Sequence, residues 1–84
     1  GTRFVMLIDD KPGVFAQVTK LFAQENANVE NIAVYHTDRG SEVVVKATGE
    51  VAVDKMTKIL QDAGFNITNV VQTTTDGKTV VWLK

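Results

Sequence analysis

The chain repeats itself with a period of 38 residues, and this repeat constrains its fold more than any other feature. When the sequence is shifted by 38 positions, similar residues coincide without a gap across three segments. The coinciding segments are Val5-Met6-Leu7 with Val43-Val44-Val45, Thr19-Lys20-Leu21-Phe22 with Thr57-Lys58-Ile59-Leu60, and Asn28-Val29-Glu30-Asn31-Ile32 with Asn66-Ile67-Thr68-Asn69-Val70. Two strand–helix–strand units related in this way predict a split βαβ arrangement, the ferredoxin-like fold.

The pattern of hydrophobic residues predicts where the helices and strands of this repeat lie. The wholly apolar run at residues 4–8 predicts a buried central strand. Apolar residues at helical spacing predict one helix over residues 14–22 and another over 53–63. Further strands are expected at 29–36, 41–48, 65–72 and, after the Asp76-Gly77 hairpin signal, 79–83. We therefore expect residues 1–84 to form one α+β domain, a two-layer βαββαβ sandwich with a four-stranded antiparallel sheet, two helices on one face and an added C-terminal hairpin strand.

Composition excludes several classes of site. The chain has no cysteine, so it offers no disulfide and no thiolate ligand, and its one histidine, His36, cannot form a multi-histidine metal cage. Nine basic and ten acidic residues give a net charge of −1, which provides no general attraction for nucleic acid or for an anionic membrane. We therefore expect no metal, no cofactor, no nucleic-acid partner and no membrane partner. With no signal-peptide pattern, we expect a cytoplasmic protein.

The loop between the first strand and the first helix carries functional groups that the equivalent loop of the second repeat lacks. Its sequence is Asp10-Lys11-Pro12-Gly13, whereas the second repeat has Thr48-Gly49-Glu50-Val51 at its own joint. Pro12 and Gly13 leave the first N–H groups of the helix open to a ligand, and the positive end of the helix dipole favours a carboxylate there. Asp10 beside them suits an ammonium group, so the joint predicts a site for a free α-amino acid. The alternative is that Asp10 caps the helix and Pro12-Gly13 makes the turn.

These residues also resemble a known family. The run Asp10-Lys11-Pro12-Gly13-Val14-Phe15-Ala16, followed by Leu21-Phe22 and then Asn28-Val29-Glu30-Asn31-Ile32, is similar to the ACT domain over roughly residues 4–72. The resemblance implies a regulatory module that binds a small ligand, usually an amino acid. ACT domains commonly pair through edge strands, and the ligand then lies between the first strand–helix loop of one subunit and the second strand of its partner.

Carried over residue by residue, the resemblance implies a ligand site with contributions from two subunits. The implied loop contacts are Asp10, Pro12, Gly13, Val14 and Phe15, and the implied partner contacts are Asn31 and Ile32, with Asn28 shaping the loop. A structural role competes for the two asparagines, because both recur in the second repeat. In that role their amides satisfy free backbone groups at strand entry.

Other functions have weaker support. Catalysis needs a base, nucleophile or acid in a supported constellation, and His36 has no obvious serine or cysteine partner, so we expect no enzyme and no catalytic residue. RNA-recognition domains of this topology stack bases on aromatic side chains of the central strands, and residues 41–48 contain none. The serious rival is a structural dimerisation module that binds no ligand.

Two helices can cover only one of the two faces of the expected sheet. Residues 4–8 and 43–45 are apolar at every position, so hydrophobic side chains project from both faces. An apolar second face predicts association with another copy, a fused domain or the C-terminal strand, unless a few valines simply lie exposed. We expect a homodimer or higher homo-oligomer whose interface transmits ligand binding. The chain would stand alone or be excised from a larger metabolic or regulatory protein.

Overall fold

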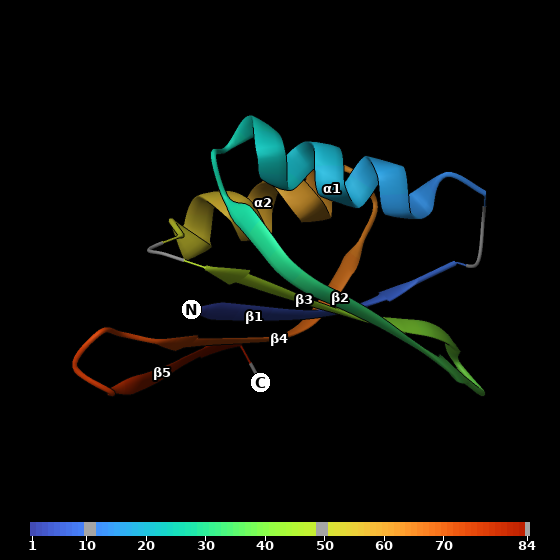
Figure 1. Ribbon diagram of the computed structural model, residues 1–84. Helices are drawn as coiled ribbons and strands as arrows, with labels where there is room; N and C mark the ends of the chain where they lie inside the picture. Colours follow the sequence, from blue (N-terminus) through green and yellow to red (C-terminus); the bar gives the residue numbers. More distant parts are fainter. Residues whose placement is uncertain (10–11, 49–50, 84) are drawn as a thin grey trace.

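The computed structural model describes residues 1–9, 12–48 and 51–83, which form two layers (Figure 1). The elements are β1 (Thr2–Ile8), α1 (Val14–Gln24), β2 (Asn28–Thr37), β3 (Gly40–Thr48), α2 (Val53–Asp62), β4 (Asn66–Thr73) and β5 (Thr79–Leu83). The five strands pair antiparallel in the order β2-β3-β1-β4-β5, and both helices cover the same face. This confirms the predicted ferredoxin-like arrangement with an added C-terminal strand.

The core lies between the helices and the sheet. Successive strand residues point to opposite faces, so alternate positions of β1 and β3 are buried beneath the helices. Phe4 of β1 and Phe22 of α1 pack edge to face, with ring centroids 5.3 Å apart. Around them gather Met6, Val18, Val43, Val45, Met56, Leu60, Ile67 and Val70. The helical spacing of these apolar residues in the sequence therefore marks the faces that pack.

Both helices end in the same turn, at positions 38 residues apart. Asn26 (φ 57°) and Gly64 (φ 96°) take the left-handed conformation that follows the last helical residues. The N–H of Ala27 donates to the carbonyl of Phe22 at 3.0 Å, and the N–H of Phe65 donates to that of Leu60 at 3.0 Å. These are the bonds of a Schellman motif, which satisfies carbonyls left free at a helix end. The sequence repeat is thus also a repeat of hydrogen bonds.

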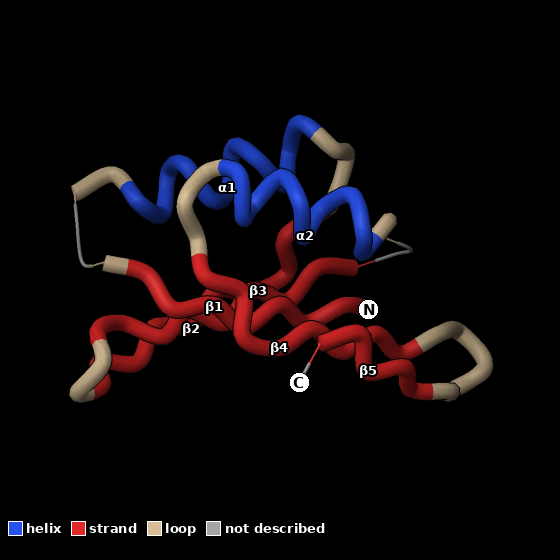
Figure 2. The backbone as a smooth tube through the Cα atoms, turned by 180° about the vertical axis from the view of Figure 1, so that it is seen from behind, coloured by secondary structure: helices blue, strands red, loops and turns tan. Residues whose placement is uncertain are grey.

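The two edges of the sheet differ. β5 pairs with β4 and forms one edge, while β2 forms the other (Figure 2). The hairpin before β5 is held by Asp76, whose carboxylate accepts bonds from the hydroxyl of Thr74 and the N–H of Lys78. The Thr74 hydroxyl first, and then the Lys78 N–H, lower the pKa of Asp76 below its ordinary value. Neither of the two described helices is long and apolar enough to cross a membrane.

Candidate functional site

A hollow of about 860 Å³ opens where β1 ends and α1 begins. One side is the start of α1, and the other is formed by the ends of the central and edge strands. Its lining residues are Ile8, Pro12, Gly13, Val14, Phe15, Ala16, Val34, His36 and Ser41. Four of the predicted site residues, namely Pro12, Gly13, Val14 and Phe15, therefore lie together around one cavity.

The start of α1 leaves backbone donors free beside this hollow. The first bond within the helix runs from the N–H of Gln17 to the carbonyl of Gly13, at 3.1 Å. The N–H groups of Val14, Phe15 and Ala16 precede it and have no acceptor among the described residues. The first turn carries no acidic side chain, and no side chain of the described residues caps it. These donors at the positive helix end can bind a carboxylate.

Gly13 serves backbone geometry. Its φ is 82°, in the left-handed region that side-chain-bearing residues rarely adopt. A β-carbon built there meets no atom within 4 Å, so the described residues leave space for one. From the sequence, the missing side chain of this glycine indicates access for a ligand. The structure assigns it first to the turn that enters α1, because valine at this φ would strain the backbone.

The opposite wall holds a polar pair that sequence reasoning missed. His36 Nδ1 lies 3.2 Å from Ser41 Oγ, and the two residues are cross-strand neighbours of β2 and β3. The expectation that His36 has no serine partner was therefore wrong. The signal was present in the turn at residues 37–40, which sets position 36 opposite 41. Ser41 is only 2% exposed, so its hydroxyl is poorly placed to attack a substrate.

The remaining predicted residues of the described chain lie on β2, with Asn28 at the start of the strand and Asn31 and Ile32 near its middle. Asn28 is opposite Thr48 and Ile32 is opposite Val45, whereas the hollow lies beside the pair of His36 and Ser41. Eight strand residues separate Asn28 from His36, about 26 Å at ~3.3 Å per residue. Within one chain, Asn28, Asn31 and Ile32 are not among the residues that line the hollow.

Asn28 forms a side-chain hydrogen bond at the start of β2. Its side-chain amide donates to the hydroxyl of Thr48 at 3.2 Å, so it joins β2 to β3 through side chains. The structural role expected from the sequence has asparagine amides satisfying backbone groups, but the partner of the Asn28 amide is a side chain. Asp10, the predicted ammonium contact, lies outside the described residues.

Titratable groups give no second candidate of this kind. Over residues 1–9, 12–48 and 51–83, no three His, Asp or Glu side chains gather closely enough to hold a metal ion. The lowered pKa of Asp76 belongs to the hairpin between β4 and β5, whose residues do not line the hollow. The chemistry of the site thus comes from backbone donors, apolar walls and one imidazole–hydroxyl pair.

The fold is that of an ACT domain. The family model described as "AHAS small subunit-like ACT domain" matches residues 4–62. The chain therefore belongs to the AHAS small subunit-like ACT domain family.

Curated relatives and a solved structure agree with this placement. An acetolactate synthase small subunit of Mycobacterium bovis and two putative ones of Mycobacterium tuberculosis are each 33% identical over 70 residues, covering 80% of this chain and 41% of the relative. The crystal structure of protein BT0572 from Bacteroides thetaiotaomicron superposes with a TM-score of 0.59 and 25% identity, over 84% of this chain and 48% of that one. The chain thus spans less than half the length of each of these proteins.

Proposed function

We propose that this chain is a regulatory domain that binds a small amino acid at the start of α1 and transmits the binding through a subunit interface. The observation that carries this proposal is the set of N–H groups of Val14, Phe15 and Ala16, which have no acceptor among the described residues and lie at the rim of an open hollow. Family membership supports a regulatory role. From the name of its relatives, the regulated enzyme would be an acetolactate synthase.

Each part of an amino acid has a place in this arrangement. The ligand's carboxylate binds the three N–H groups, and the helix dipole adds to those bonds. Its side chain lies against the apolar walls formed by Ile8, Val14 and Val34, which favour a small apolar group. The ammonium group is assigned to Asp10 from the sequence alone.

A second copy would complete the site along β2. This strand is one of the two edges of the described sheet, and an exposed edge pairs readily with another strand. Antiparallel pairing of two β2 strands moves Asn31 and Ile32 of one copy toward the hollow end of the other. A ligand held between two copies stabilises one mutual arrangement and shifts the population toward it. Couplings of this kind are typically about 1–3 kcal/mol.

The alternative is a dimerisation module without a ligand. The free edge of β2 supports association whether or not the hollow is filled. The two functions differ in what stabilises the fold. The regulatory domain is stabilised by an amino acid, whereas the module is stabilised by protein concentration alone.

A thermal-shift screen of the free amino acids against their carboxamides tests the proposal. A ligand at 100 times its Kd adds about 2.7 kcal/mol to the free energy of unfolding. We expect one or two small apolar amino acids to raise the Tm, and their carboxamides to raise it far less because the carboxylate is absent. No shift in a dimeric sample would favour the module without a ligand. Equal shifts for acid and amide would refute the role of the N–H groups.

A further inference from the structure

The sheet face turned away from the helices has its charges sorted toward opposite ends. The strand register divides this face into three rows that cross the strands. The first row is Asn31, Lys46, Arg3, Val71 and Val81, the second is Ala33, Val44, Val5 and Asn69, and the third is Tyr35, Glu42, Leu7 and Asn66. No described element covers this face, as both helices pack on the other (Figure 1).

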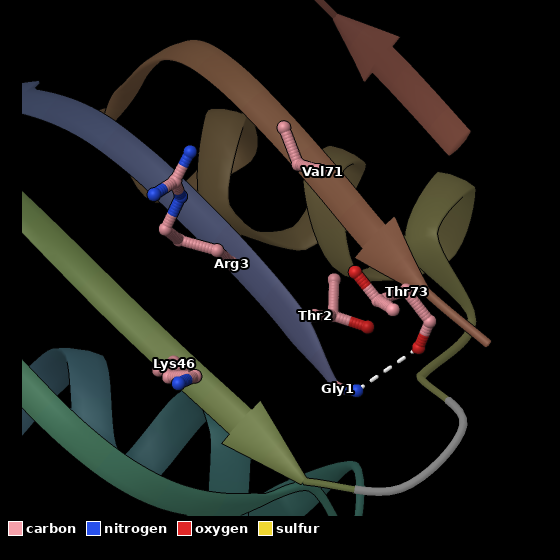
Figure 3. Close-up of a pocket in the computed structure, with 6 residues that line it drawn as sticks. All are labelled: Gly1, Thr2, Arg3, Lys46, Val71 and Thr73. Atoms are coloured by element: carbon pink, nitrogen blue, oxygen red, sulfur yellow. Dashed lines mark hydrogen bonds between the residues drawn. The ribbon is translucent and has the colours of Figure 1, made fainter. Parts of the chain in front are cut away.

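The first row places two cations side by side. Arg3 of β1 and Lys46 of β3 are direct cross-strand partners, and they line a hollow of about 460 Å³ with Val71 and Thr73 (Figure 3). Like charges at directly opposed strand positions destabilise a sheet. Neither cation forms an ion pair with any described carboxylate. Within the part of the chain that the structure describes, this leaves a repulsive pair on an open face.

The third row holds the opposite charge, out of reach within one chain. Glu42 lies four residues from Lys46 along β3, about 13 Å at ~3.3 Å per residue. The row between them is apolar across its middle, where Ala33, Val44 and Val5 are partly buried. One face thus presents a basic end, an apolar middle and an acidic end.

We propose that this face docks on the same face of a second copy of the chain, with the strands of the two sheets antiparallel. A two-fold axis along the middle row then sets Lys46 of each copy over Glu42 of the other, and the apolar rows pack on each other. Stacking the sheets parallel would instead place the cations over cations. The charge pattern therefore selects one of the two orientations.

The dimensions of the molecule suit such a contact. Face-to-face sheets pack about 10 Å apart, with side chains from the two inner faces interdigitating. Stable interfaces bury about 800 Å² on each partner. A chain measuring 37 × 26 × 21 Å along its principal axes, with the sheet as one of two layers, offers a face of that order. The acidic side chain of the second copy enters the hollow between Arg3 and Lys46.

This contact is separate from pairing along the β2 edge, and it does not depend on the ligand. The edge contact uses backbone groups of β2, whereas the face contact uses side chains of β1 and β3. Both contacts together would make a tetramer of two edge-paired dimers. The face contact alone would make a dimer.

Charge reversal on this face tests the proposal by sedimentation equilibrium of the 84-residue chain. We expect Lys46→Glu and Glu42→Lys each to weaken association at least tenfold, because each replaces two ion pairs by two like-charge contacts. The double variant should restore it. Lys20→Glu on the exposed side of α1 is the control and should leave association unchanged. Loss of association confined to the single face variants, with rescue in the double, supports the face contact.

Two results would overturn it. Association that is unchanged by both reversals excludes this face while leaving edge pairing of β2 intact. Association that falls in the double variant as far as in the singles shows that the charges do not pair across the interface. Circular dichroism checks that each variant is folded. Lys46→Glu should even raise the Tm of the separated chain, because it gives Arg3 an opposite charge across the strand.

Discussion

The helices of the two repeats end alike and begin differently. α1 and α2 both stop at a left-handed residue with the same pair of hydrogen bonds, 38 positions apart. α2 has Asp54 in its first turn, whereas α1 has no acidic residue there. Ala16 stands at the repeat position of Asp54. The shared ends serve the fold, and we propose that the unshared start of α1, with no acidic residue to offset the helix dipole, is where a ligand binds.

The largest effect should appear where the two halves are alike. Phe22 and Leu60 are repeat equivalents, and both are fully buried. Truncation to alanine leaves a cavity, so we expect Phe22→Ala to cost about 3–5 kcal/mol and Leu60→Ala about 2–5 kcal/mol. Urea denaturation measures both. A cost below 1 kcal/mol in either half would show that the halves do not share one core.

The next largest effect concerns ligand binding and should distinguish the start of α1 from the start of α2. Ala16→Asp gives α1 the acidic first turn of α2, so its carboxylate competes with that of a ligand. We expect the ligand-induced gain, up to about 2.7 kcal/mol at 100 times Kd, to disappear while the fold without ligand is not destabilised. Thermal shift with and without amino acid measures both. Ala16→Asn is the neutral control of similar size.

The reverse change completes this test. Asp54→Ala removes the acidic group from α2 and should leave the ligand-induced shift intact. If both helix starts respond equally to their substitutions, the difference between them has no role in ligand binding.

A smaller effect concerns the shared helix ends. Gly64 has φ 96°, and an added β-carbon would meet nothing within 4 Å, so the cost of Gly64→Ala is conformational alone. We expect a loss of about 1–2 kcal/mol in the free energy of unfolding. Asn26→Gly, at the equivalent position of α1, should instead be neutral or slightly stabilising. Destabilisation by Asn26→Gly would break the equivalence of the two ends.

The smallest effect lies in the β4–β5 hairpin. The pKa of Asp76 is lowered in the folded chain, so its ionised form stabilises the fold above the unfolded value of 3.8. That contribution is lost as the pH falls through the lowered pKa. The difference in Tm between the wild type and Asp76→Asn should therefore be small at neutral pH and should disappear in acid. A difference that widens below pH 3.8 would contradict the assignment.

Local patterns were sufficient to predict the fold and part of the lining of the candidate hollow. The gap-free repeat and the apolar periodicity identified every helix and strand, and the Pro12-Gly13 turn identified the start of α1 as the place to look. Val34, His36 and Ser41 were missed because their approach depends on the pairing of β2 with β3. Asn28 was assigned to shaping the loop by resemblance, yet it lies at the start of β2, whereas the hollow lies beside His36 near the end of that strand.

The backbone conformation of Gly13 was also harder to predict from the sequence than the consequence of its missing side chain. The absence of a side chain at Gly13 suggested access for a ligand. The positive φ of this residue shows that the turn itself requires glycine. A residue pattern specifies which chemical groups are present. A backbone angle depends in addition on how the elements on either side, β1 and α1, are placed in the fold.

The most direct test of ligand binding at α1 is an NMR titration of backbone amides with the amino acid that gives the largest thermal shift. The account predicts saturable shifts of the amide protons of Val14, Phe15 and Ala16, because a carboxylate accepts their hydrogen bonds. The amides of Val53, Asp54 and Lys55 at the start of α2 are the internal control and should stay unchanged. Equal shifts at both helix starts, or shifts at neither while the Tm rises, would contradict the account.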